Sequence, residues 1–117
     1  MKVLVLEDNK ERLEWFSDTF SKCELYIAMT AEKAADAIMK WEFDLIFIDH
    51  DLGKVRDGYD FAKILAKEID EGRIVNDPSI YIHSLNPVGT KRITSVLKDA
   101  IICPFSDLIK KSENSYN

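Results

Sequence analysis

Apolar and polar residues follow one another in short blocks, and the spacing within each block predicts a strand or a helix. Five short apolar blocks predict strands at 2–7, 23–28, 44–49, 79–84 and 100–103. Apolar residues at helical spacing predict helices at 10–20, 31–41, 59–69, 88–99 and 107–111. Strands that alternate with helices are typical of a doubly wound, mostly parallel α/β sheet covered on both faces. We therefore expect one domain over 1–111 and a polar tail at 112–117.

Residues at the predicted helix ends support this division. Thr30 and Asn86 can cap the helices that follow them, and Pro87 suits a first helical position. Gly72 suits the end of the third helix, and Ser106 can cap the last one. The fourth helix is expected to turn its apolar residues inward: Val88, Ile93, Val96, Leu97 and Ala100.

The composition narrows the classes of function. With 117 residues the chain can bury one core, and its net charge of −5 argues against broad binding to nucleic acids or anionic membranes. A small phosphate ligand in a local pocket remains compatible with this charge. No apolar run approaches the roughly 20 residues of a membrane span, and the first residues do not read as a secretory signal. Cys23 and Cys103 form no metal-binding motif, so we expect reduced thiols and a cytoplasmic protein.

Acidic residues follow two of the predicted strands. Glu7 and Asp8 come after the first strand, and Asp49 comes after the third. In the flavodoxin-like strand order 2-1-3-4-5 these strands are neighbours, and ligands bind beyond their carboxyl ends. Three converging carboxylates repel one another unless a cation or protons intervene, so we predict Mg²⁺ or another divalent cation here. Alternatively these acids only mark loops, and Asp8 caps the first helix with Glu11 at its third position.

The two histidines of the chain follow the third and fourth predicted strands. His50 and His83 would then share one edge of the sheet, and imidazole exchanges a proton near neutral pH. On opposite sides of a bound phosphoester, they could act as general base and general acid. Alternatively, His83 is satisfied by a backbone carbonyl and His50 is a solvated loop residue.

The start of the fourth helix is a candidate anion site. Free backbone N–H groups at 88–90 would open toward a ligand, Gly89 would allow close approach of a phosphate, and Ser84 would add a hydroxyl donor. The same features are also explained by simple helix capping. The predicted phosphate-binding residues are Ser84, Asn86, Gly89 and Thr90. The Asp-Gly pair at 57–58 is turn chemistry, to which we assign no function.

Taken together, these residues resemble the receiver domains of two-component response regulators. The resemblance rests on the acidic pair, on "IFIDHDLG", on the serine after the fourth strand and on the proline after the fifth. It implies that Asp49 accepts a phosphoryl group, that the carbonyl of Asp51 joins the metal ligands, and that Ser84 supplies a hydroxyl. Receivers carry a lysine before that proline, where this chain has Cys103. A histidine kinase or another protein would be the partner.

A narrower resemblance is to the cyclic-phosphate-processing receiver domain. It rests on "IDHDLG", "GYDFAKIL" and "IHSLNPVG", whose hallmark positions are His50, His83, Ser84, Asn86, Pro87 and Gly89. This resemblance implies a metal-assisted phosphoesterase acting on a cyclic phosphate, in a small molecule or at an RNA end. The catalytic residues would be His50, His83 and Asp49. The alternatives are a stand-alone receiver phosphorylated on Asp49 and a degenerate receiver that only binds proteins.

Overall fold

The computed structural model describes residues 1–52 and 57–114, in which strands and helices alternate as the sequence predicts. The strands are β1 (Lys2–Leu6), β2 (Glu24–Ala28), β3 (Leu45–Ile48), β4 (Ser79–Ile82) and β5 (Ile101–Ile102). The helices are α1 (Lys10–Thr19), α2 (Ala31–Lys40), α3 (Gly58–Asp70), α4 (Pro87–Val96) and α5 (Phe105–Asn114). None of the helices in the described ranges is long and apolar enough to cross a membrane.

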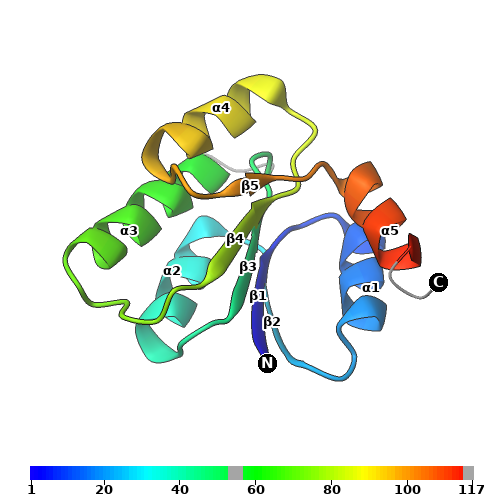
Figure 1. The fold of residues 1–117 in the computed structure, drawn as a ribbon, viewed down its shortest axis with the longest axis horizontal. Coiled ribbons are helices and arrows are strands. Elements are labelled where there is room, and N and C mark those ends of the chain that lie inside the picture. Colours follow the sequence, from blue (N-terminus) through cyan, green and yellow to red (C-terminus); the bar gives the residue numbers. More distant parts are fainter. Residues whose placement is uncertain (53–56, 115–117) are drawn as a thin grey trace.

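All strands are parallel and lie in the order β2-β1-β3-β4-β5. Helices α1 and α5 cover one face of the sheet, and α2, α3 and α4 cover the other (Figure 1). This arrangement confirms the predicted fold, a flavodoxin-like doubly wound sheet. The parallel direction brings the carboxyl ends of β1, β3 and β4 to one edge.

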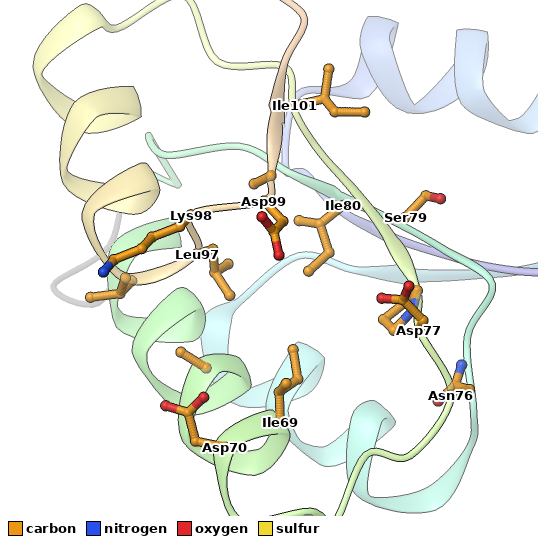
Figure 2. Close-up of a pocket in the computed structure, with 14 residues that line it drawn as sticks. Ile69, Asp70, Asn76, Asp77, Ser79, Ile80, Leu97, Lys98, Asp99 and Ile101 are labelled. Atoms are coloured by element: carbon orange, nitrogen blue, oxygen red, sulfur yellow. The ribbon is translucent and has the colours of Figure 1, made fainter.

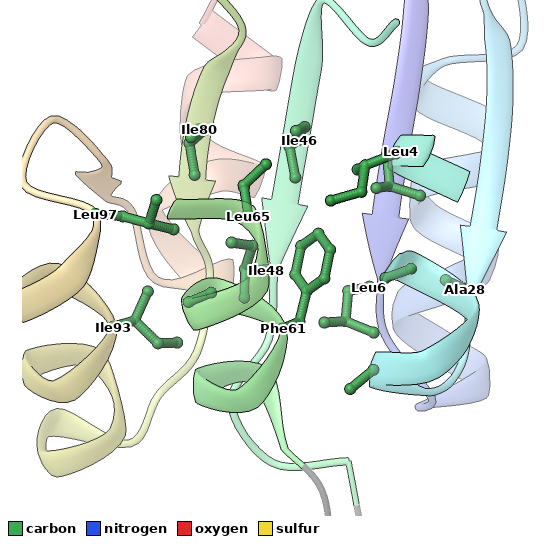
Figure 3. Close-up of a cluster of buried hydrophobic side chains, with 14 of the residues drawn as sticks. Leu4, Leu6, Ala28, Ile46, Ile48, Phe61, Leu65, Ile80, Ile93 and Leu97 are labelled. Atoms are coloured by element: carbon green, nitrogen blue, oxygen red, sulfur yellow. The ribbon is translucent and has the colours of Figure 1, made fainter. Parts of the chain in front are cut away.

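The two faces of the sheet bury different kinds of side chain. On the side of α2, α3 and α4 the core is mainly aliphatic, with Leu4, Leu6, Ile46 and Ile48 packed around Phe61 (Figure 3). On the side of α1 and α5 the core is aromatic: Phe16 contacts Phe20, Phe47 and Phe105 with ring centroids 5.1 to 6.3 Å apart. Burial on both faces explains why β1 is almost wholly apolar.

Local sequence explains most helix ends. Thr30 accepts a hydrogen bond from Lys33 N and Asn86 accepts one from Gly89 N, so both predicted caps are confirmed. Gly72 follows α3 with φ of 76°, a conformation that favours glycine. Asp8 does not cap α1; Asn9, one residue later, holds that position.

Two expectations about the end of the chain are wrong. Helix α5 begins at Phe105, so Ser106 lies inside its first turn instead of capping it. The helix also continues to Asn114, beyond the predicted start of the tail at residue 112. No glycine or proline interrupts this segment, so the helix has no local reason to stop at Lys111. The remainder of the predicted tail, 115–117, lies outside the described residues.

Coverage of the sheet is incomplete at β5. Ile101 and Ile102 are 45% and 54% exposed, although the sequence predicted strands buried on both faces. A two-residue edge strand offers little surface for a helix to cover. Val88 is also exposed, contrary to prediction, because the buried stripe of α4 runs through Gly89, Thr90 and Ile93 and leaves the preceding position facing water.

Gly58 provides a direct test of how tightly α3 joins the sheet. A Cβ at this position would lie 2.0 Å from Asp49 O and 2.9 Å from His50 Cα. We expect Gly58→Ala to lower the free energy of unfolding, measured in urea, by about 3 kcal/mol or more, because the backbone of Asp49 and His50 would have to move. Gly72→Ala is the control: it meets nothing within 4 Å and should cost only about 1 kcal/mol for its positive φ. Equal losses in the two variants would contradict the close approach.

Candidate functional site

Four residues just beyond the strands lie in one row across the sheet. Each backbone N–H of Asp49, His83 and Cys103 donates to a carbonyl of the neighbouring strand, at 3.1, 3.1 and 2.9 Å. The register pairs Leu6 with Ile48, Ile48 with Ile82, and Ile82 with Ile102, so the next residues are also neighbours. The row is therefore Glu7, Asp49, His83 and Cys103.

Alternation along the strands decides which way each side chain faces. Val5, Phe47 and Tyr81 pack toward α1 and α5, so the residues two positions later face the same way. Glu7, Asp49 and His83 therefore meet on one side of the sheet. His50 directly follows Asp49, and Ser84 directly follows His83. Their side chains therefore face the opposite side of the sheet, toward α3 and α4.

Glu7 is the most heavily bonded side chain at this edge. Its carboxylate accepts hydrogen bonds from Arg12 Nε at 2.6 Å, Arg12 Nη2 at 3.2 Å and His83 Nε2 at 2.8 Å. The backbone N–H groups of Asp8 and Asn9 add two more at 2.9 Å. Burial alone would raise the pKa of Glu7, but the bonds from His83, Arg12 and Asn9 lower it to about 2. Glu7 is thus ionised at neutral pH.

Asp49 is buried with much weaker support. Its Oδ2 has no hydrogen-bond partner in the described part of the chain, and the one cation paired with it there, Arg12 Nη2, is 3.8 Å away. Burial, followed by the charge of Glu7, raises the pKa of Asp49 to about 7, and Arg12 offsets this only in part. Asp49 is therefore available to bind a cation or a proton.

His83 lies in an apolar setting behind Glu7. Its side chain is fully buried, and its ring meets those of Phe16, Phe47 and Phe105 with centroids 5.2 to 6.5 Å apart. Burial lowers its pKa even though Glu7 favours the charged form. Nε2–H donates to Glu7, while Nδ1 has no partner among the described residues. A neutral imidazole fits this arrangement, because a protonated Nδ1 would leave a buried donor unsatisfied.

Part of the predicted metal site comes together. One potential ligand atom from each of Glu7, Asp49 and His83 lies within 4.8 Å of the others. The unpartnered Asp49 Oδ2 fits a cation at this position. An imidazole beside two carboxylates suits ions such as Mn²⁺ or Zn²⁺ as well as Mg²⁺. The side chain of Asp8 does not belong to this group, so only Glu7 and Asp49 of the three predicted carboxylates come together. The predicted metal contact of the Asp51 carbonyl stays a prediction.

His50 belongs to a second cluster, on the other side of the strand ends. Its Nδ1 donates to Asp51 Oδ1 at 2.9 Å, and its Nε2 lies 3.2 Å from Asp57 Oδ2. A Cβ on Gly89 would lie 2.2 Å from His50 Cγ, so the glycine makes room for the imidazole ring. His50 is accordingly held between two carboxylates and the start of α4, apart from His83.

The start of α4 differs from the predicted anion site. Gly89 N, which we expected to be free, donates to Asn86 Oδ1 at 3.1 Å. Ser84 Oγ accepts a hydrogen bond from Asn86 N at 3.0 Å, and Thr90 N donates to Asn86 O at 2.9 Å. Asn86 Nδ2 reaches Asp51 Oδ1 at 3.3 Å. These contacts cap the helix, and Asn86 also reaches the Asp51 side chain that bonds His50. A role of these residues in phosphate binding stays a prediction.

Sequence reasoning missed two residues of these clusters. Arg12 comes from the first turn of α1, and only the folded chain shows that it reaches back to Glu7. Asp57 was assigned to a turn, but it caps α3 through a capping box with Asp60 and also approaches His50.

Two of the hollows in the described part of the chain are lined by residues other than Glu7, Asp49 and His83. A cavity of about 590 Å³ is lined by residues from the end of α3, the start of β4 and the end of α4, including Asp70, Asp77 and Asp99 (Figure 2). Since β4 starts there, this cavity lies at the amino edge of the sheet, opposite the candidate site. A groove of about 400 Å³ borders the candidate site between α4 and β5 and includes Ser84 and Pro104.

The sequence matches the family described as cyclic-phosphate processing receiver domain over residues 2–99. The chain belongs to this family, and with its parallel sheet it is a receiver domain. No curated protein matches it.

Solved structures show the same fold. The Vibrio cholerae chemotaxis protein CheY4 is 19% identical with a TM-score of 0.72, over 97% of this chain and 96% of that one. The receiver domain of Francisella response regulator 1452 is 23% identical with a TM-score of 0.68, over 98% and 95%. A Burkholderia pseudomallei response regulator, solved with a phosphorylated aspartic acid and a calcium ion, is 16% identical with a TM-score of 0.68. That match covers 86% of this chain but only 58% of the Burkholderia protein.

The raised pKa of Asp49 predicts a specific dependence of stability on pH. The folded pKa of about 7 exceeds the unfolded value of 3.8, so the folded state loses stability as the pH rises through this interval. Asp49→Asn removes this effect. In urea unfolding with EDTA present, its stability relative to the native chain should rise by on the order of 2 kcal/mol between pH 5 and pH 8.

The control for this measurement is Asp36→Asn, on the exposed face of α2. Asp49 is intact in this variant, so the loss of stability with rising pH should remain. Glu7, whose pKa is lowered to about 2, stays ionised between pH 5 and pH 8 and does not contribute to the change. A pH-independent difference for Asp49→Asn would show that Asp49 is ionised in the fold without penalty.

Proposed function

We propose that this receiver domain binds a cyclic phosphate at the carboxyl edge of its sheet and opens the ring by hydrolysis with a divalent cation. The observation that carries the proposal is Asp49, whose buried Oδ2 lacks a hydrogen-bond partner within the described ranges beside Glu7 and His83. Membership of a family described by cyclic-phosphate processing supports this choice of ligand. A bound divalent cation would neutralise charge that develops on the phosphate oxygens.

Each buried residue has a different task in this proposal. Asp49 would hold the cation through its open oxygen, with Glu7 as a further ligand. His83 donates to Glu7 and keeps it in place, which makes His83 a positioning residue. The sequence predicted His83 as an acid or base, but its side chain is 0% exposed and its Nε2 is already bonded.

His50 is the better candidate for proton transfer. Its side chain is 11% exposed, compared with 0% for His83, and Asp51 fixes the orientation of the ring. Water attacks phosphorus, one ester P–O bond breaks, and the product is a phosphomonoester with a free hydroxyl. An imidazole that takes the proton from the attacking water can return it to the leaving oxygen, so one histidine serves both steps.

We predict different kinetic effects for the two histidines with 2′,3′-cyclic AMP in the presence of Mn²⁺ or Mg²⁺. His50→Ala should lower the turnover number by about 100-fold, the usual range for loss of acid–base catalysis. Gly89→Ala should have a similar effect, because its Cβ would displace the His50 ring. Ser95→Ala, exposed on α4, is the matched control and should retain full turnover. Product formation is followed by phosphorus NMR.

His83 is tested by a pair of variants. His83→Ala leaves Glu7 with one donor fewer and should lose most activity and some stability. His83→Gln can still donate to Glu7 and should keep turnover within about tenfold of the native chain.

Full turnover in His50→Ala would contradict the mechanism. The absence of hydrolysis in the native chain, with an Asp49-dependent mass gain from a phosphodonor, would replace it with phosphoryl transfer to Asp49.

A further inference from the structure

We propose that the guanidinium of Arg12 binds the phosphate group of the ligand. This inference rests on the proposed function, since it assigns the anion contact of the same site. Its starting point is exposure: the side chains of Glu7 and His83 are 0% exposed and that of Asp49 is 6%, whereas that of Arg12 is 29% exposed. Of these four side chains, that of Arg12 is therefore the most accessible to a ligand arriving from solvent.

The guanidinium is held in a fixed orientation. Nε and Nη2 both donate to the carboxylate of Glu7, which anchors the planar group by two bonds. A guanidinium has five N–H donors, and these two bonds use two of them. The orientation also brings Nη2 to 3.8 Å from Asp49 Oδ2. The anchored arginine thus reaches toward the open oxygen of Asp49 with donors to spare.

Among the described residues, the neighbouring positions of the row supply no competing cation. Cys103, the last member of the row, is buried and carries a thiol that cannot be positively charged. Among the described residues, Arg12 is the only one with an ion pair to Asp49. A phosphate beside Asp49 would face two acids, and a local positive charge is needed to offset this repulsion. Arg12 is placed to provide it, and an arginine fork matches phosphate oxygens.

The test uses two probes, inorganic phosphate and 2′,3′-cyclic AMP, titrated by protein-detected NMR in EDTA and again with Mn²⁺. Arg12→Gln should raise the dissociation constant of both probes at least about tenfold, the scale of a lost charge-assisted hydrogen bond. Arg12→Lys keeps the charge without the fork and should give an intermediate value. Lys10→Gln, an exposed cation on the same helix, is the control and should stay within about twofold of the native chain.

Salt dependence separates contact with phosphate from a purely structural role. If Arg12 meets the phosphate, affinity should fall with rising salt in the native chain and fall less steeply in Arg12→Gln. Arg12→Lys supplies the same comparison if the glutamine variant fails to fold. Unchanged affinity in Arg12→Gln, or an unchanged salt slope, would overturn the role of Arg12.

The outcomes also separate this inference from the proposed function. If the native chain binds phosphate through Arg12 but does not hydrolyse 2′,3′-cyclic AMP, hydrolysis is wrong and the role of Arg12 stands. If hydrolysis occurs and Arg12→Gln binds both probes normally, the role of Arg12 is wrong and hydrolysis stands. If the native chain binds neither probe, with or without Mn²⁺, both are wrong.

Discussion

The carboxyl edge of this sheet depends on one buried carboxylate, that of Glu7. An ionised acid in the interior costs free energy unless donors surround it, and Glu7 has five such bonds from Arg12, His83, Asp8 and Asn9. Those bonds tie α1, β1 and β4 together at the edge. Asp49 lies beside Glu7, but its Oδ2 accepts no hydrogen bond from a described residue. Glu7 is therefore stabilised within the protein, whereas Asp49 can still bind a ligand.

The strand period of two divides the edge into two clusters. Asp49 and His50 are adjacent in sequence, so they face opposite sides of the sheet. His83 then shares a side with Asp49, while His50 is held by Asp51, Asp57 and the start of α4. Two histidines that a motif brings to one edge are therefore not equivalent: one supports the buried acids, and the other is the candidate for proton transfer.

The sequence was sufficient for the fold because its signals are local. Apolar blocks, the caps Thr30 and Asn86, and Gly72 predicted the alternating elements correctly. The site was predicted only in part, because its partners depend on three-dimensional geometry. Because side chains alternate between the two faces of a strand, the adjacent positions of Asp49 and His50 already place the two histidines on opposite sides of the sheet. The contact of Arg12 with Glu7, in contrast, depends on how α1 packs.

The partly exposed side chain of Arg12 and the unpaired Oδ2 of Asp49 would together define the place where a phosphate binds. A crystal structure of the native chain with Mn²⁺ and adenosine 2′-monophosphate or 3′-monophosphate, the products of ring opening, tests this most directly. We expect phosphate oxygens within hydrogen-bond distance of Arg12 and a metal ion bound by Asp49. A phosphate seated away from both residues, for instance in the groove between α4 and β5, would contradict it.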